Sequence, residues 1–140
     1  TIVLGENGIA AFQKFFDILL GAPEGAALWH CSAGKDRTGL ATALLLHVLG
    51  VSEDSIVADY LATNNHLVNI EGTIEKAIPK WAQSKSLMKS LQVMRAVDPH
   101  YLAAAKPAIE EKYKTVDDYL KQALGLNDEK QEALRAKYLI

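Results

Sequence analysis

A ten-residue stretch of this chain places a cysteine and an arginine at a spacing that suits phosphate chemistry. Residues 30–39 read His-Cys-Ser-Ala-Gly-Lys-Asp-Arg-Thr-Gly. The five residues between Cys31 and Arg37 can curl into a loop whose amide N–H groups converge at the start of a helix, and such a loop binds a dianionic phosphate. Arg37 offers two coplanar donors to phosphate oxygens, and the same positive field favours the thiolate form of Cys31. The stretch therefore predicts a nucleophilic cysteine beside a bound phosphate.

The remaining residues of this stretch suit the same purpose. Gly34 lets the backbone approach a ligand without a side chain in the way, and the Thr38 hydroxyl can donate to the sulfur. Cys31 is the single cysteine of the chain, so that neither an internal disulfide nor a multi-cysteine zinc site is expected, and we expect no metal and no cofactor. The residues expected to bind the phosphate are Ser32, Ala33, Gly34, Lys35, Asp36, Arg37 and Thr38.

The stretch resembles the C-x5-R-[ST] signature of cysteine-dependent protein tyrosine phosphatases. With Ala-Gly-Lys-Asp ahead of the arginine, it is similar to the form found in a bacterial tyrosine phosphatase family that has lipid-active relatives. Further similarity lies at residues 57–61, 109–113, 116–120 and 124–126. The resemblance covers most of residues 8–140 and is least clear over residues 66–97.

The resemblance implies a two-step mechanism through a cysteinyl-phosphate. Cys31 attacks phosphorus, while Arg37 and the loop amides stabilise the charge on the equatorial oxygens. Asp36 is the expected general acid, because an aspartate before the arginine is similar to the pattern of lipid-active relatives and no upstream acid lies in a recognisable acid loop. An acid supplied from outside this sequence is the alternative. Lys35 is expected to point at the rim of the loop and to favour highly anionic head groups.

The expected function is that of an enzyme, a protein tyrosine phosphatase, with phosphoserine and phosphothreonine as further candidate substrates. A phosphoinositide phosphatase with the same mechanism is the alternative that Lys35 and Asp36 together favour. A non-catalytic phosphate-binding module is the alternative from another class. Such a module binds a phosphate without turning it over, and therefore never forms a phosphoenzyme.

The elements on either side of the loop must position it. A short apolar run at residues 26–30 predicts a buried strand before the loop, and residues 2–4 offer a second strand. Residues 37–49, apolar on almost every side, predict a central buried helix. Other helices are expected at residues 9–20, 73–80 and 86–95, from the N-cap Ser52 to about residue 64, and from the N-caps Asp98, Thr115 and Asn127.

The fold that the resemblance implies is α/β, a cysteine-phosphatase fold with a mixed sheet flanked by helices. This chain itself is expected to be mostly helical, because it offers only one or two strands. A lone buried strand cannot satisfy its own backbone groups. We therefore expect residues 1–140 to be the C-terminal portion of a single tyrosine phosphatase domain, whose N-terminal strands lie outside this sequence.

Composition and charge limit the partners. The chain is 49% hydrophobic and 23% charged, as globular proteins are, and its net charge of −2 does not indicate a nucleic-acid binder. Residues 39–51 form the longest uncharged apolar run, which is too short to cross a bilayer. No signal peptide is visible, and localisation stays open between cytoplasm and secretion.

One segment departs from this overall balance. Residues 76–95 carry no acid but five cations, which are Lys76, Lys80, Lys85, Lys89 and Arg95. We interpret this segment as a basic flap near the site that meets an anionic substrate or a membrane surface. The expected partner is accordingly a phosphorylated protein or a phosphoinositide.

Overall fold

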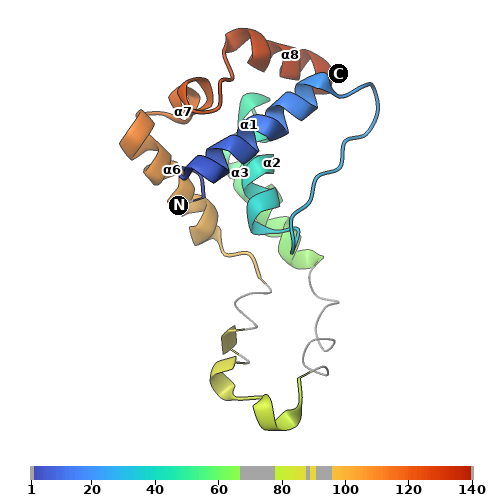
Figure 1. The fold of residues 1–140 in the computed structure, drawn as a ribbon, viewed down its shortest axis with the longest axis vertical. Coiled ribbons are helices and arrows are strands. Elements are labelled where there is room, and N and C mark those ends of the chain that lie inside the picture. The colour runs from blue at the N-terminus through green and yellow to red at the C-terminus, as the bar shows by residue number, and fades with distance from the viewer. Residues whose placement is uncertain (1, 67–77, 88, 91–95, 140) are drawn as a thin grey trace.

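Helices make up the regular structure of the described part of the chain (Figure 1). The computed structural model describes residues 2–66, 78–87, 89–90 and 96–139. With η marking a 3-10 helix, the elements are α1 (Glu6–Gly21), α2 (Asp36–Val48), α3 (Glu53–Ala62), η1 (Thr63–Asn65), η3 (Lys80–Ala82), α6 (Pro99–Tyr113), α7 (Val116–Gln122) and α8 (Asp128–Tyr138).

The predicted sheet is absent from the described residues, none of which lies in a strand. The expectation of a mixed-sheet α/β fold is therefore wrong for this part of the molecule. Residues 26–30, predicted to be a buried strand, form an irregular connection from α1 to α2, and Leu28 is 93% exposed. Residues 2–4 form a turn. A short apolar run predicts a buried strand only if neighbouring strands bind its backbone, and none lies beside this one among the described residues.

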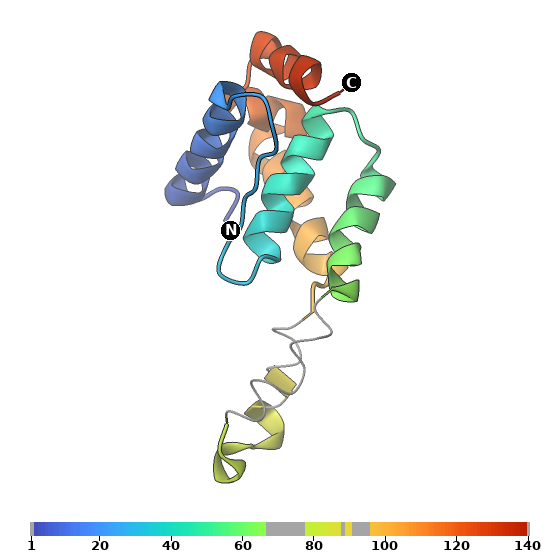
Figure 2. The same ribbon diagram turned by 90° about the vertical axis from the view of Figure 1, so that its right-hand side faces the viewer.

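The predicted central helix is confirmed as α2, which α3 and α8 contact directly. From Ala41 to Val48 every residue is buried or half-buried. Turning the molecule shows α1 and α3 on opposite sides of α2, with α8 close to the end of α2 that is farther from the loop (Figure 2). The loop that carries Cys31 precedes the other end of α2, so that one central helix connects the core to the loop.

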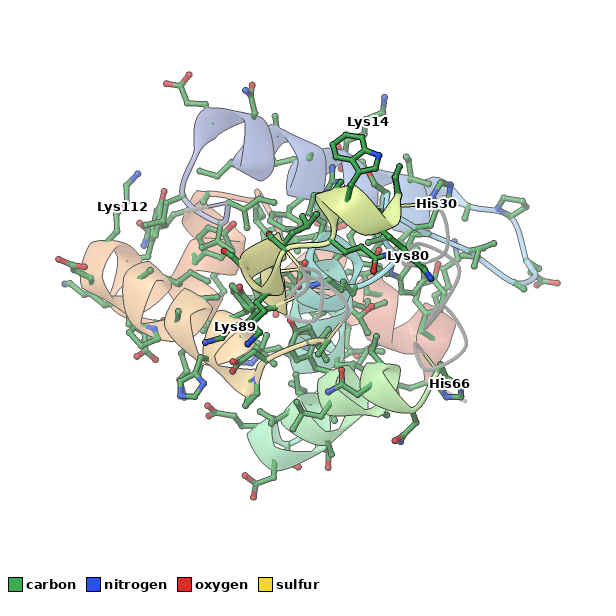
Figure 3. All side chains as sticks on the ribbon, turned by 90° about the horizontal axis from the view of Figure 1, so that it is seen from below. Lys14, His30, His66, Lys80, Lys89 and Lys112 are labelled. Carbon is green, nitrogen blue, oxygen red and sulfur yellow. The ribbon has the colours of Figure 1, made fainter. Side chains whose placement is uncertain are left out.

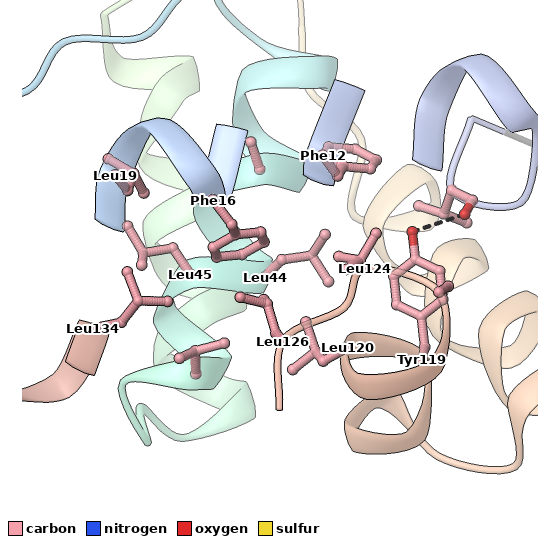
Figure 4. Close-up of a cluster of buried hydrophobic side chains, with 14 of the residues drawn as sticks. Phe12, Phe16, Leu19, Leu44, Leu45, Tyr119, Leu120, Leu124, Leu126 and Leu134 are labelled. Atoms are coloured by element: carbon pink, nitrogen blue, oxygen red, sulfur yellow. Dashed lines mark hydrogen bonds between the residues drawn. The ribbon is translucent and has the colours of Figure 1, made fainter. Parts of the chain in front are cut away.

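The core is formed where α1, α2, α7 and α8 meet (Figure 4). Aromatic and branched side chains fill it, since such side chains remove the largest apolar area from water. The Tyr119 hydroxyl also donates a hydrogen bond of 2.8 Å to the Val3 carbonyl, which ties the first turn of the chain to α7. The side chains with the least exposure are Val3, Phe16, Val48, Tyr119, Leu120, Leu126 and Leu134.

Four helices begin at the N-caps that the sequence predicts. The side chains of Ser52, Asp98, Thr115 and Asn127 each accept a hydrogen bond from a backbone N–H of the first turn. Such caps satisfy donors that have no partner within the helix. Pro107 lies inside α6, which continues past it to Tyr113.

The described residues between 78 and 90 project away from the helical body, beyond the end of α2 that carries the loop (Figures 1 and 2). Where the chain returns to the body, the Asn64 amide pairs with the backbone of Val97. Asn64 Nδ2 donates to the Val97 carbonyl at 3.0 Å, and the Val97 N–H donates to Asn64 Oδ1 at 2.8 Å. The side-chain amide therefore joins two points that are 33 residues apart.

Parts of the basic flap lie outside the described residues. These parts include Lys76, Arg95 and most of the two helices predicted at residues 73–80 and 86–95. Residues 78 and 79 are not helical, whereas residues 85–87 and 89–90 are. Within the described chain, no helix has the length and apolar character needed to cross a membrane.

Candidate active site

The loop of residues 31–35 joins the irregular connection to the first turn of α2. Gly34 has a φ of +66°, a left-handed conformation that only glycine adopts without strain. The chain then enters α2 directly, where the Gly39 N–H donates to the Lys35 carbonyl at 2.6 Å. The loop thus lies at the positive end of a helix dipole, as the spacing of Cys31 and Arg37 predicts.

Cys31 is half-buried in this loop, and its pKa is lowered from 9.0 to about 6. Burial alone raises the pKa of the thiol. Hydrogen bonds from the Thr38 side chain and backbone and from the amides of Ala33 and Gly34 outweigh that effect. The direction of this shift favours the thiolate form of Cys31 near neutral pH.

Thr38 contributes twice to the low pKa of Cys31, through its side-chain hydroxyl and through its backbone N–H. The hydroxyl is buried, and Thr38 Oγ1 has no hydrogen-bond partner of good geometry among the described residues. A buried hydroxyl is costly without an acceptor, and the Cys31 sulfur is the acceptor to which the lowered pKa points.

Arg37 reaches back across the loop. Its Nη2 donates to Ser32 Oγ at 2.9 Å, which holds the guanidinium over the residues that follow the cysteine. The side chains of both residues are exposed, so that an anion can approach the guanidinium from solvent. The structure thus brings the predicted residues Cys31, Ser32, Arg37 and Thr38 together around one loop.

Lys35 does not point at the rim of the loop, as the sequence led us to expect. The residue is only 8% exposed, and Nζ donates to the Ala96 carbonyl at 3.2 Å. The same ammonium lies 2.9 Å from Asp36 Oδ2. The reason is local: the carbonyl and the carboxylate satisfy the ammonium on the inner side of the loop, whereas the rim offers it water alone. A contact between Lys35 and substrate stays a prediction.

Asp36 is the first residue of α2, and its side chain is 46% exposed. Besides Lys35, it has a partner that sequence reasoning missed. The hydroxyl of Tyr60, in α3, donates to Asp36 Oδ1 at 3.4 Å. The carboxyl group is therefore held on its inner side by two donors and open on its outer side.

A glycine inside α2 is the signal that could have revealed Tyr60. Glycine in a helix interior costs about 1 kcal/mol relative to alanine, so that Gly39 needs a reason. The reason is close contact: a Cβ at position 39 would lie 2.5 Å from two ring carbons of Tyr60. The Tyr60 ring thus lies directly against the backbone of α2, one turn after Asp36.

Within the described chain, no three His, Cys, Asp or Glu side chains are grouped as metal ligands would be. The chemistry available at the loop is that of a thiolate, a guanidinium, backbone amides and one partly exposed carboxyl group. This set can bind a phosphate dianion, attack it, and exchange a proton with its leaving group.

Comparison with known proteins gives a consistent result. The family model described as the tyrosine phosphatase family matches residues 2–140. A Cupriavidus necator protein, provisionally named a tyrosine-protein phosphatase, is 38% identical over 126 residues, which are 89% of this chain and 45% of the relative. The triple specificity protein phosphatase PtpB of Mycobacterium tuberculosis is 36% identical over 104 residues, which are 69% of this chain and 38% of the relative. The chain spans less than half the length of these curated relatives.

Proposed function

Because the chain belongs to the tyrosine phosphatase family, as its loop motif predicted, we propose that it hydrolyses phosphotyrosine with Cys31 as the nucleophile. The observation that carries the proposal is the loop at the start of α2, where Arg37 bonds to Ser32 across the loop and hydrogen bonds from Thr38 and the loop amides lower the pKa of Cys31 to about 6. A structural cysteine has no need of such donors, whereas a phosphoryl acceptor works as the thiolate.

In the first step the Cys31 thiolate attacks phosphorus, an S–P bond forms, and the bond from phosphorus to the phenolic oxygen breaks. The Asp36 carboxyl group faces solvent on its outer side and gives its proton to the leaving oxygen. Arg37 and the loop amides stabilise the charge that develops on the three equatorial oxygens. The products of this step are tyrosine and a cysteinyl-phosphate.

In the second step a water molecule attacks the cysteinyl-phosphate. The Asp36 carboxylate now takes a proton from that water, the S–P bond breaks, and its electron pair restores the thiolate. Inorganic phosphate leaves, and Asp36 holds the proton for the next cycle. The same carboxyl group thus serves as acid and then as base.

The test compares the full-length protein with its Cys31→Ser variant on a radiolabelled phosphotyrosyl peptide. A rapid quench is expected to trap a phosphoenzyme in the native protein and none in the variant. Phosphate release should fall by at least about a thousandfold, because a serine hydroxyl is protonated at neutral pH. Turnover that persists in Cys31→Ser would contradict the mechanism. Phosphate binding without a phosphoenzyme in the native protein would establish the binding module instead.

A phosphoinositide is the second candidate substrate, and the projecting residues favour it. Lys80, Lys85 and Lys89 are exposed there, and Trp81 is 89% exposed between them. In the view toward that end of the molecule, Lys80 appears on the side of His30, which leads into the loop, whereas Lys89 appears on the other side of the projecting segment (Figure 3). Cations together with an exposed tryptophan are typical of segments that lie at an anionic lipid surface.

This second candidate predicts a specific effect of charge. Reversal of Lys80, Lys85 and Lys89 to glutamate should slow hydrolysis of a phosphoinositide in anionic vesicles by about tenfold or more, since each cation contributes about 1 kcal/mol at such a surface. Hydrolysis of a soluble phosphotyrosyl peptide should change little. Equal rates on vesicles before and after charge reversal would contradict the lipid candidate and leave the peptide candidate intact.

A further inference from the structure

Tyr60 is a buried tyrosine beside the loop, and the two steps of the proposed mechanism give this residue no role. The residue is 4% exposed, lies in α3, and comes 24 positions after Asp36 in the sequence. Its hydroxyl donates to Asp36 Oδ1 at 3.4 Å. Its ring lies against Gly39, which leaves no room for a Cβ there. The ring is therefore fixed by α2, and the hydroxyl is aimed at the carboxyl group.

Packing alone does not fix the Asp36 side chain. A hollow of about 230 Å³ lies next to it, lined by Leu40, Tyr60, Tyr101 and Ala105 among others. A carboxyl group beside such a space can rotate unless hydrogen bonds hold it. Two side chains supply these bonds, Lys35 and Tyr60.

The two partners differ in what they can do during the reaction. The Lys35 ammonium only donates, and so it holds the ionised carboxylate. A tyrosine hydroxyl both donates and accepts, so that it can hold the group as a carboxylate and as a carboxylic acid. The mechanism requires both forms of Asp36 in turn, and Tyr60 is the partner that suits both.

We propose that Tyr60 is a positioning residue that keeps the Asp36 carboxyl group in place for proton transfer. This inference rests on the proposed function. Burial and the charge of Asp36 raise the pKa of Tyr60 to about 12, so that its hydroxyl keeps its proton over the pH range in which a phosphatase works. Tyr60 acts through Asp36, to which its hydroxyl is bonded.

The test uses Tyr60→Phe in the full-length protein, because phenylalanine keeps the ring on Gly39 and removes only the hydroxyl. The substrates are phenyl phosphate, whose leaving group needs a proton, and 2,4-dinitrophenyl phosphate, whose leaving group does not. The quantity compared is kcat/KM, because it reports formation of the cysteinyl-phosphate and not the later hydrolysis that both substrates share. We expect kcat/KM to fall by about tenfold on phenyl phosphate and by less than about twofold on the dinitrophenyl ester.

A matched control separates positioning from loss of stability. Tyr119→Phe also removes a hydroxyl from a buried ring, in this case a ring on α7. The Tyr119 hydroxyl donates to the Val3 carbonyl at 2.8 Å. This variant should lower the melting temperature and leave the ratio of the two kcat/KM values as it is in the native protein. A Tyr60→Phe variant that lowers kcat/KM on both substrates equally would overturn the proposal.

The same substitution in an Asp36→Asn background shows whether Tyr60 acts through Asp36. Asp36→Asn should lower kcat/KM on phenyl phosphate far more than on the dinitrophenyl ester, and adding Tyr60→Phe should then change neither value. A further loss on adding Tyr60→Phe overturns the role given to Tyr60 and leaves the proposed function standing. An equal fall in kcat/KM on both substrates in Asp36→Asn overturns the acid role of Asp36, and the inference about Tyr60 with it.

Discussion

The two ends of α2 are held by different interactions. At its C-terminal half, Leu44, Leu45 and Val48 are buried in the core between α1 and α8. At its first turn, Arg37 is exposed and Asp36 is half-exposed, and hydrogen bonds hold both. Burial of apolar area holds the core end of α2 in place, whereas a few hydrogen-bond donors and acceptors hold the loop end. Substitutions at the core end should therefore unfold the protein, and substitutions at the loop end should change its chemistry.

The largest effect is expected in the core into which the C-terminal half of α2 packs, where Phe16 of α1 also lies. Phe16→Ala should lower the free energy of unfolding by about 3–5 kcal/mol, because Phe16 is fully buried and the cavity cannot close completely. Chemical denaturation measures this loss. Ile18→Ala is the matched control on α1, since Ile18 is 58% exposed, and it should cost less than about 0.5 kcal/mol. Similar losses for the two variants would show that this face of α1 is not part of the core.

At the loop end, Arg37→Lys should lower kcat/KM on a phosphotyrosyl peptide by about 100- to 1000-fold. A lysine keeps the charge and loses the planar pair of donors. The free energy of unfolding should stay the same, because the Arg37 side chain is exposed. Arg135→Lys, remote from the loop, is the control and should leave kcat/KM unchanged. If Arg37→Lys instead unfolded the protein without slowing the folded fraction, the contrast between the two ends would fail.

Gly39→Ala tests the contact between the first turns of α2 and the Tyr60 ring. The new Cβ would lie 2.5 Å from the Tyr60 ring, so we expect a loss of about 1–3 kcal/mol in stability, measured by denaturation, together with slower hydrolysis of phenyl phosphate. Gly21→Ala, at the end of α1, has nothing within 4 Å of its added Cβ and should be neutral or slightly stabilising. A neutral Gly39→Ala variant would mean that Tyr60 can move away at no cost.

The smallest effect concerns pH. The proposed activity needs the thiolate, and so it should fall as the pH drops through about 6, the pKa of Cys31. Thr38→Val removes a donor to the sulfur, which raises that pKa and should move the acid limb of the kcat/KM profile up by about one pH unit. Thr42→Val, whose hydroxyl bonds to Trp29 and to the Thr38 carbonyl, should not move it. An acid limb that stays in place in Thr38→Val would remove Thr38 from this role.

The same pKa shift has a consequence for stability. Because the pKa of the thiol is depressed in the folded protein, the stability that it contributes is fully present above about pH 9.0 and is lost as the pH falls through about 6. Thr38→Val should flatten this dependence, and denaturation at a series of pH values measures it. A dependence as steep as in the native protein would place the cause of the shift elsewhere.

The sequence by itself was sufficient to predict the features that depend on residues close together in the chain. The motif from Cys31 to Thr38 identified the family, and the caps at Ser52, Asp98 and Thr115 located three helix starts. These features depend on residues within a few positions of one another. Their geometry follows from backbone conformation and from hydrogen bonds within one turn, which a linear pattern records.

Tertiary structure alone decided the features that depend on distant partners. The apolar run at residues 26–30 is exposed except at Trp29, because no strand lies beside it among the described residues. Lys35 turns inward to the carbonyl of Ala96, 61 positions away, and Asp36 meets Tyr60 only because α3 packs on α2. A side chain takes the direction in which its polar atoms find partners, and those partners are set by how helices pack rather than by their neighbours in the sequence.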